Sequence, residues 1–205
     1  MIKALIFDVG GVLVRTVDRS RRAILEAELG LPKGQTDETV FNSAMGQAAQ
    51  RGEVTSSNLW AWVQADFGLD KQGLGHFRHE FWGGDRVNEE LVALIRSLHP
   101  RYQTAIISNF MDDLRRSLHE EYPIADAFDL IVISAEEKVM KPDPLIFQRT
   151  IERLGRKPEE CVFVDDFAHN VEGAQAVGMH AIHYTPETEM ERELVKLGVG
   201  AASMG

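Results

Sequence analysis

The sequence predicts an α/β protein: a Rossmann-like, doubly wound parallel sheet with a small helical cap inserted after the first strand. Two patterns predict this fold. From residue 88 onward, short apolar runs alternate with segments of helical length, which is typical of βαβ units on a parallel sheet. Residues 18–81, in contrast, show helical patterning without strands. We therefore expect a core of residues 1–16 and 86–205, interrupted by a cap of residues 17–85.

The first strand comprises residues 3–7 and ends in one acid and two glycines. Its apolar side chains are typical of a buried strand in a parallel sheet. Asp8 follows directly, at the end where open α/β folds bind ligands. Gly10 and Gly11 would let a ligand approach the backbone closely. By itself, Asp8 could equally well cap a turn, so the rest of the chain decides between the two interpretations.

The cap is expected to contain three helices. The first spans residues 21–29 and the second spans residues 39–50. Either Thr55 or Ser56 can cap the third helix, which carries apolar residues at helical spacing. Residues 73–84 are rich in glycine, and we expect them to lead the chain back towards the first strand.

After the cap, helices and strands alternate along the chain. Helices are expected at residues 89–98, 111–121, 145–154, 171–177 and 189–197, and strands at residues 104–108, 130–133, 161–165 and 181–184. The tail, residues 198–205, lacks this patterning, and we expect it to be disordered. Because every strand is separated from the next by a helix, the strands are expected to run parallel.

The composition is that of an ordinary globular protein, with 44% hydrophobic and 26% charged residues in a chain of 205. Its formal net charge of −10 argues against nucleic-acid and membrane partners, because both need clustered Lys and Arg. A small anionic substrate remains compatible, since a metal or local groups can reverse the sign inside one pocket. The sequence does not indicate an oligomeric state.

Cysteine usage and the amino terminus predict a cytoplasmic protein. Cys161 is the only cysteine, so no intrachain disulfide can form, and a reducing compartment fits. Met1 leads directly into the first strand, which leaves no room for a signal peptide. No apolar run approaches the ~20 residues that a bilayer-spanning helix needs.

Polar residues follow three of the predicted strands, and a lysine stands between them in a rigid loop. They are Asp8 after the first strand, Ser108 and Asn109 after the second, Asp165 and Asp166 after the fourth, and Lys141, which precedes Pro142. In a doubly wound sheet these strand ends converge on one crevice. A carboxylate nucleophile, an acid pair, a hydroxyl with an amide and an ammonium suit phosphoryl transfer through an aspartyl-phosphate.

Each of these residues also has an ordinary interpretation. One acid of Asp165-Asp166 could cap the following helix, but two adjacent acids at a buried strand end repel each other. A divalent cation relieves that repulsion, and Mg²⁺ prefers one or two carboxylates plus waters. Ser108-Asn109 could likewise be a cap pair. Lys141 could be a solvated side chain, although the neighbouring prolines restrict its backbone and favour a placed charge.

Together these motifs resemble the haloacid dehalogenase-like (HAD) hydrolase superfamily, which consists mostly of phosphatases. Asp8, Ser108, Lys141 and the pair Asp165-Asp166 match its four motifs in order and in strand context, over the whole chain. The inserted helices are similar to the small C1-type cap of subfamily IA. Three further segments are most similar to the branch that holds bacterial glucose-1-phosphate phosphatases and the amino-terminal phosphatase domain of soluble epoxide hydrolases: residues 7–13, 51–55 and 164–174.

The resemblance implies a Mg²⁺ cofactor and a nucleophile. Asp8 would attack phosphorus. The Asp8 carboxylate, the backbone carbonyl of Gly10 and the Asp166 carboxylate would hold Mg²⁺, with Asp165 as a nearer or water-mediated partner.

The resemblance also implies groups that bind the phosphate. Ser108 and the backbone N–H of Asn109 would bind the transferring phosphoryl group, and Lys141 would neutralise the charge of the nucleophile and the phosphate. The expected function is that of a Mg²⁺-dependent phosphatase that hydrolyses a small phosphorylated metabolite through an aspartyl-phosphate. Nothing in the cap identifies that metabolite.

Gly10 departs from the family pattern. Phosphatases of this family usually carry an acid at this position, which protonates the leaving oxygen and later activates the water. General acid–base catalysis contributes roughly 10²–10⁴-fold, so Gly10 predicts a slow enzyme or a substrate that needs little acid help. Two alternatives follow: a dehalogenase-like carbon–halogen hydrolase, against which the Asp165-Asp166 pair argues, and a catalytically impaired phosphate-binding protein.

Overall fold

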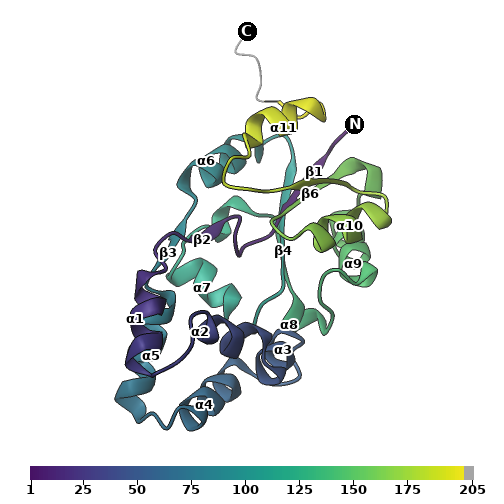
Figure 1. The fold of residues 1–205 in the computed structure, drawn as a ribbon. Helices are drawn as coiled ribbons and strands as arrows, with labels where there is room; N and C mark the ends of the chain where they lie inside the picture. The colour runs from purple at the N-terminus through teal and green to yellow at the C-terminus, as the bar shows by residue number, and fades with distance from the viewer. Residues whose placement is uncertain (201–205) are drawn as a thin grey trace.

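The computed structural model describes residues 1–200, and its centre is a five-stranded parallel sheet (Figure 1). The strands stand in the order β5-β4-β1-β6-β7 and comprise β1 (Ala4–Phe7), β4 (Gln103–Ser108), β5 (Leu130–Ile133), β6 (Cys161–Asp165) and β7 (His180–His183). Every neighbouring pair is parallel. The chain adds strands first on one side of β1 and then on the other, which confirms the predicted doubly wound fold.

Helices cover both faces of the sheet (Figure 1). One face packs against α6 (Glu89–Leu98), α7 (Leu114–Glu120) and α11 (Met190–Lys196), and the other against α9 (Pro144–Leu154) and α10 (Ala168–Ala176). Side chains of β1 alternate between the two faces: Leu5 and Phe7 belong to the first apolar cluster, and Ala4 and Ile6 to the second. Because β1 is buried on both sides, the residue that follows it is held rigidly.

The cap lies between two short strands that pair antiparallel, β2 (Val14–Thr16) and β3 (Asp85–Val87). It contains α1 (Ser20–Glu28), α2 (Gln35–Asp37), a π-helical turn (Glu38–Asn42), α3 (Ala44–Gln50), α4 (Ser56–Asp66) and α5 (Lys71–Trp82). Its helices enclose an apolar cluster of their own. In Figure 1 the cap is the purple and blue lobe below the sheet. We propose that the cap comprises residues 17–85, because Thr16 and Asp85 pair where the chain leaves and re-enters the core.

Three sequence-based expectations for the cap need correction. The helix expected at residues 39–50 is broken at Ser43, whose extended backbone ends the π-helical turn and whose side chain caps α3 by accepting from the N–H of Gly46. The glycine-rich stretch 73–84 is mostly helical, because Asp70 caps α5 by accepting from the N–H of Gly73. The strands β2 and β3 were not expected.

The tail also differs in part from the expectation of disorder. Val199 is 1% exposed and packs in the core, because a turn after α11 folds the chain back onto the sheet-covering helices. Residues 201–205 lie outside the described part. Among the described residues, none of the helices has the length and apolar character needed to cross a membrane.

Candidate active site

The carboxyl ends of three adjacent strands place the predicted residues together. Asp8 follows β1, Ser108 ends β4 and Asp165 ends β6, and β1 pairs with both of the other strands. Lys141 comes from the loop before α9 and reaches Asp8 Oδ1 at 2.8 Å and Asp165 Oδ2 at 2.7 Å. All four side chains are buried. The convergence that the sequence predicted for these four residues is therefore present.

Lys141 uses all three of its donors inside the protein. Besides the two carboxylates, its ammonium donates to the backbone carbonyl of Ile107 at 3.0 Å. The Lys141 side chain is 1% exposed, and the two carboxylates raise its pKa although burial opposes this. Lys141 is therefore a fixed cation that orients Asp8. Contact with a phosphate would require one of these three hydrogen bonds to be exchanged.

Asp8 is buried although it follows the last residue of β1. It is 6% exposed, and burial raises its pKa to about 7, against the lowering effect of Lys141. Asp165 and Asp166 raise it further. A carboxylate in such a site is poorly solvated, so its charge is stabilised mainly by the lysine beside it. A second positive group at this position would stabilise the ionised, nucleophilic form.

Asp165 is fully enclosed and its two oxygens are both occupied. Oδ1 accepts from the N–H of Phe167 at 2.8 Å and from Asn170 Nδ2 at 3.1 Å, and Oδ2 accepts from Lys141 and from the same Asn170 nitrogen, again at 3.1 Å. Asp165 thus has little capacity left for a metal. We propose that it holds Lys141 in place.

Asp166 is the acid that remains available. It is half-buried, and its Oδ1 atom is buried without a hydrogen-bond partner among the described residues. Burial, followed by the charge of Asp165, raises the pKa of Asp166. The His183 ring lies 2.9 Å from the Asp166 backbone carbonyl. An orphaned carboxylate oxygen at this position is what a bound cation would satisfy.

These acids fit a magnesium ion. Carboxylate oxygens of Asp8, Asp165 and Asp166 lie within 4.8 Å of one another. Lys141 forms ion pairs with Asp8 and Asp165 and offsets one of the three negative charges. A Cβ atom at Gly11 would overlap the Asp166 carboxylate, and Gly11 has a φ of +77°. Glycine is therefore required beside Asp166 for both space and backbone conformation. Oxygen ligands and an excess of negative charge are the chemistry that Mg²⁺ favours.

Two asparagines organise the site in ways that the sequence did not predict. Asn109, expected to offer its backbone N–H, also ties down the lysine loop: its side chain accepts from the N–H of Lys141 at 2.8 Å and donates to the Lys141 carbonyl at 2.9 Å. Asn170 bridges the two Asp165 oxygens. Its position five residues after Asp165, in the first turn of α10, is the signal that could have identified it.

The cap is fixed against the loops at the carboxyl edge of the sheet. Ser134 Oγ donates to the carbonyl of Gln50 in α3 at 2.6 Å, and Asp112 accepts from the N–H of Ser56 in α4 at 2.9 Å. Lys138 contributes a further hydrogen bond to the carbonyl of Gly52. The cap therefore meets the core next to Ser108 and Asn109, on the side of the sheet edge where the acids lie.

Comparison with known proteins gives a consistent result. A family model described as haloacid dehalogenase-like hydrolase matches residues 2–178. A sesquiterpene phosphatase from Aspergillus oryzae is 28% identical over 196 residues, which cover 95% of this chain and 96% of that protein. The bifunctional epoxide hydrolase 2 of Mus musculus is 25% identical over 209 residues, covering 93% of this chain but 38% of that protein.

Solved structures agree on the fold. A HAD family enzyme from Bacteroides thetaiotaomicron, in complex with magnesium and inorganic phosphate, superposes with a TM-score of 0.80 at 22% sequence identity. The match covers 94% of this chain and 99% of that one. At this level of identity the likeness concerns the fold, so the chemistry has to be argued from the residues of this chain.

Proposed function

The chain belongs to the haloacid dehalogenase-like hydrolase family, and from this premise we propose that it is a Mg²⁺-dependent phosphatase. Its substrate would be the phosphate monoester of a small molecule, hydrolysed through an aspartyl-phosphate at Asp8. One observation carries the proposal: a buried carboxylate, hydrogen-bonded to a buried lysine, lies beside a second acid whose buried oxygen has no hydrogen-bond partner in the part of the chain that the structure describes. The sesquiterpene phosphatase among the relatives supports a phosphatase in particular.

The first chemical step would use Asp8 as the nucleophile. A carboxylate oxygen of Asp8 forms a bond to phosphorus while the bond from phosphorus to the ester oxygen breaks, and the leaving oxygen takes a proton from water. Lys141 would favour the ionised form of Asp8 and align its carboxylate. Ser108 and the backbone N–H of Asn109 would bind the oxygens of the phosphoryl group. During the transfer, the attacking Asp8 oxygen, the phosphorus and the leaving ester oxygen would lie in line.

The second step would return the enzyme to its starting state. Water attacks phosphorus, the bond to Asp8 breaks, inorganic phosphate leaves and Asp8 is again a carboxylate. Gly10 offers no side chain to activate this water, so the proposed intermediate is expected to break down slowly. Mg²⁺, held by Asp8, Asp166 and the Gly10 carbonyl with Asp165 nearby, would supply charge neutralisation for the phosphoryl oxygens.

The same proposal includes a reducing compartment such as the cytoplasm. Cys161 is fully buried, and burial raises the pKa of its thiol to about 12. Such a thiol is inert towards oxidants and disulfide exchange. A single unreactive cysteine is compatible with, and typical of, proteins that rely on no disulfide.

A substrate screen with matched controls tests this function. The purified protein is incubated with a panel of phosphate monoesters, with p-nitrophenyl phosphate and with 2-chloropropionate, each with Mg²⁺ or with EDTA. We expect phosphate release that needs Mg²⁺ and is lost in Asp8→Asn, and no chloride release. Chloride release without Mg²⁺ would establish the dehalogenase alternative. Phosphate binding with no turnover of any ester would establish the impaired phosphate-binding protein.

A further inference from the structure

We propose that the substrate's leaving group is predominantly apolar and contacts an aromatic wall formed by Phe41, Trp82 and Phe110. The inference rests on the proposed function, because it concerns the alcohol part of the same phosphate ester. It names a substrate class, the monophosphate of a neutral, largely hydrocarbon alcohol, which the catalytic residues themselves do not determine.

The three rings come from three elements and meet where the cap joins the core. Phe41 lies in the π-helical turn, Trp82 ends α5, and Phe110 follows β4. Ring centroids are 5.8 Å apart for Phe41 and Trp82, 6.2 Å for Phe41 and Phe110, and 5.8 Å for Trp82 and Phe110. These are contact distances for aromatic pairs, so the rings form one continuous apolar surface.

This surface adjoins the proposed phosphate site by chain connectivity. Phe110 directly follows Asn109, whose side chain is bonded on both sides to the backbone of Lys141. Phe110 packs against the apolar cluster of the sheet and against that of the cap. Phe110 therefore connects the strand end that carries Ser108 and Asn109 with the aromatic rings of the cap.

The wall differs from the cap interior by its exposure. Phe77 and Phe81 are fully buried and Trp60 is 5% exposed, which is what a structural core requires. Phe41, Trp82 and Phe110 are only partly buried. Leaving aromatic surface partly open costs the free energy that burial would provide, at about 25 cal/mol per Å². Ligand sites are lined predominantly by hydrophobic and aromatic side chains.

The wall is also rigid. The N–H of Phe110 donates to Ser134 Oγ at 3.0 Å, and the Phe110 carbonyl accepts from Ser134 Oγ at 3.2 Å and from the N–H of Ala135 at 3.3 Å. Ser134 in turn donates to the cap at Gln50. A fixed backbone keeps the ring at a constant position relative to Asn109, which is what selection by shape requires.

The charges beside the wall disfavour a second anionic group on the substrate. Asp112 and Asp113 follow Phe110 by two and three residues, and among the described residues no group forms a hydrogen bond with the buried Oδ1 atom of Asp113. The nearby cation Arg78 stacks on Trp60, with its guanidinium carbon 5.0 Å from the ring centroid. Arg116, which also acts on Asp113, pairs with Glu120 at 3.8 Å. Both nearby cations are therefore engaged, which favours a neutral leaving group over a bisphosphate or a phosphorylated acid.

Binding of n-alkylphosphonates to the Mg²⁺-loaded enzyme tests the inference without depending on turnover. We measure affinity by calorimetry for chains from ethyl to octyl, with the phosphonate of a polyol as the polar comparison. Burial of a methylene group predicts an affinity increase of about fourfold per CH₂ until the wall is covered. A flat series, or preference for the polyol, would overturn the inference.

Matched variants locate the effect. Phe41→Ala should flatten the alkyl series, whereas Phe67→Ala should keep it, because Phe67 is a partly buried cap aromatic that stacks on Phe77 instead. If Phe41→Ala does not fold, Phe41→Leu is used and should reduce the slope. An unchanged slope in the folded Phe41 variant would overturn the assignment of the wall. A protein that binds alkylphosphonates in a graded series but hydrolyses no ester refutes the proposed function, and leaves the wall intact.

Discussion

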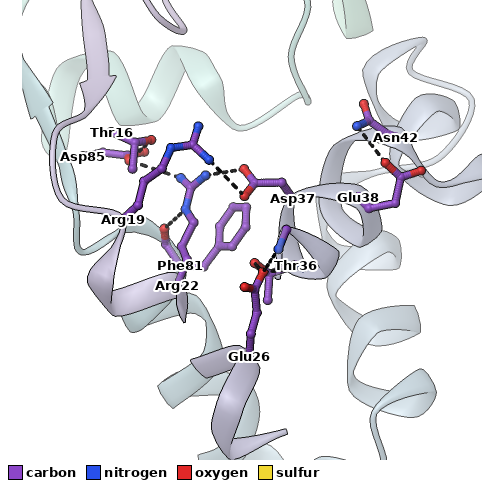
Figure 2. Close-up of polar contacts among 11 residues, drawn as sticks. Thr16, Arg19, Arg22, Glu26, Thr36, Asp37, Glu38, Asn42, Phe81 and Asp85 are labelled. Atoms are coloured by element: carbon purple, nitrogen blue, oxygen red, sulfur yellow. Dashed lines mark hydrogen bonds and ion pairs between the residues drawn. The ribbon is translucent and has the colours of Figure 1, made fainter. Parts of the chain in front are cut away.

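Two clusters of buried charge lie in this protein, one in the core and one at the base of the cap, and they differ in balance. The core cluster comprises Asp8, Lys141, Asp165 and Asp166 and carries three acids against one cation. The cap cluster comprises the buried pair Arg22 and Asp85 with the half-buried Asp37, and the exposed Arg19 joins it through Asp37 at 3.7 Å (Figure 2), so that two acids face two cations. Burial of unbalanced charge is costly unless a ligand compensates it.

In the cap cluster, the central guanidinium has an acceptor for each of its nitrogens. Arg22 is 5% exposed, pairs with Asp37, and donates to Asp85 Oδ1 at 3.2 Å and to the carbonyl of Phe81 at 2.8 Å. Its guanidinium also lies 4.2 Å from the centroid of the Phe81 ring, and Thr16 donates to the same Asp85 oxygen at 2.7 Å. Figure 2 shows these groups converging from β2, α1, α2 and β3.

The difference separates a structural cluster from a chemical one. In the cap, each guanidinium nitrogen of Arg22 has an acceptor. The cluster therefore links α1 to β2 and β3, the two strands through which the chain leaves and re-enters the core. In the core, Asp166 retains an oxygen that has no hydrogen-bond partner in residues 1–200. Buried charge alone therefore does not identify a functional site, whereas an unsatisfied excess of one sign does.

Removing the central cation of each cluster gives the largest expected difference. Lys141→Met leaves Asp8 and Asp165 buried without a counter-charge, so activity should fall on the order of a thousandfold. Arg22→Met leaves Asp85 in the same condition, and each variant should lose about 3–5 kcal/mol of unfolding free energy. The folded Arg22 variant should nevertheless keep most of its activity. Urea denaturation and turnover of p-nitrophenyl phosphate measure both quantities.

The two variants can contradict the comparison in separate ways. If Arg22→Met is folded but as inactive as Lys141→Met, the cap cluster takes part in the chemistry. If Lys141→Met turns over at the wild-type rate, the buried lysine is structural, and the core cluster is no different from the cap cluster.

Magnesium should act on one cluster only. At a hundredfold excess over its Kd, a ligand that binds only the native state stabilises it by about 2.7 kcal/mol. We expect Mg²⁺ to raise the Tm of the wild type and of Asp85→Asn, and to lose this effect in Asp166→Asn. Asp165→Asn should lose less affinity than Asp166→Asn, because both oxygens of Asp165 are already bonded. Calorimetric titration ranks the affinities, and equal values for the two core variants would disprove the assignment.

Gly10 lacks the acidic side chain that phosphatases of this family usually carry at its position, and introducing one has a smaller expected effect. Wild-type rates should rise steeply with leaving-group acidity, so that aryl and acyl phosphates exceed alkyl phosphates. A Cβ atom at Gly10 meets nothing within 4 Å, so Gly10→Asp causes no clash at its Cβ atom. It should flatten the dependence and raise alkyl phosphate turnover by about 10²-fold. A flat wild-type series would reveal a proton donor elsewhere.

The pH dependence of Asp85 gives the smallest expected effect. Burial raises its pKa above 3.8, although Thr16 and Arg22 act in the opposite direction. A pKa raised by folding adds stability that is complete below pH 3.8 and is lost as pH rises through the folded-state value. The Tm of Asp85→Asn minus that of the wild type should therefore increase as pH rises above 3.8. A difference that is constant or decreases would contradict burial as the dominant influence.

The strands and their polar ends could be predicted because their signals are local. The strands at residues 130–133 and 161–165 have the predicted bounds, since each is a continuous apolar run between helices. The doubly wound order then brings Asp8, Ser108 and Asp165 to one edge. Lys141 also has a local signal, because it directly precedes Pro142 in the loop between those strands, and the structure brings it to Asp8 and Asp165.

The remaining features depend on contacts that are distant in sequence. Strands β2 and β3 have three residues each and are separated by the whole cap, so no local pattern marks them. Asn109 and Asn170 act through hydrogen bonds to Lys141 and Asp165 that exist only in the folded chain. The saturation of the cap cluster is equally invisible in sequence, because Arg22 and Asp85 are 63 residues apart.

Trapping a phosphoryl group on the enzyme tests the central claim most directly. Excess protein is mixed with p-nitrophenyl phosphate and Mg²⁺, quenched in acid within the first turnover, and digested for peptide mass spectrometry. Because Gly10 has no side chain to activate the water that hydrolyses the intermediate, the phosphoryl-enzyme should accumulate. We expect one phosphoryl group on Asp8 and none in Asp8→Asn. Full turnover in the quenched samples with Asp8 unmodified, or with the phosphoryl group on another residue, would contradict the account.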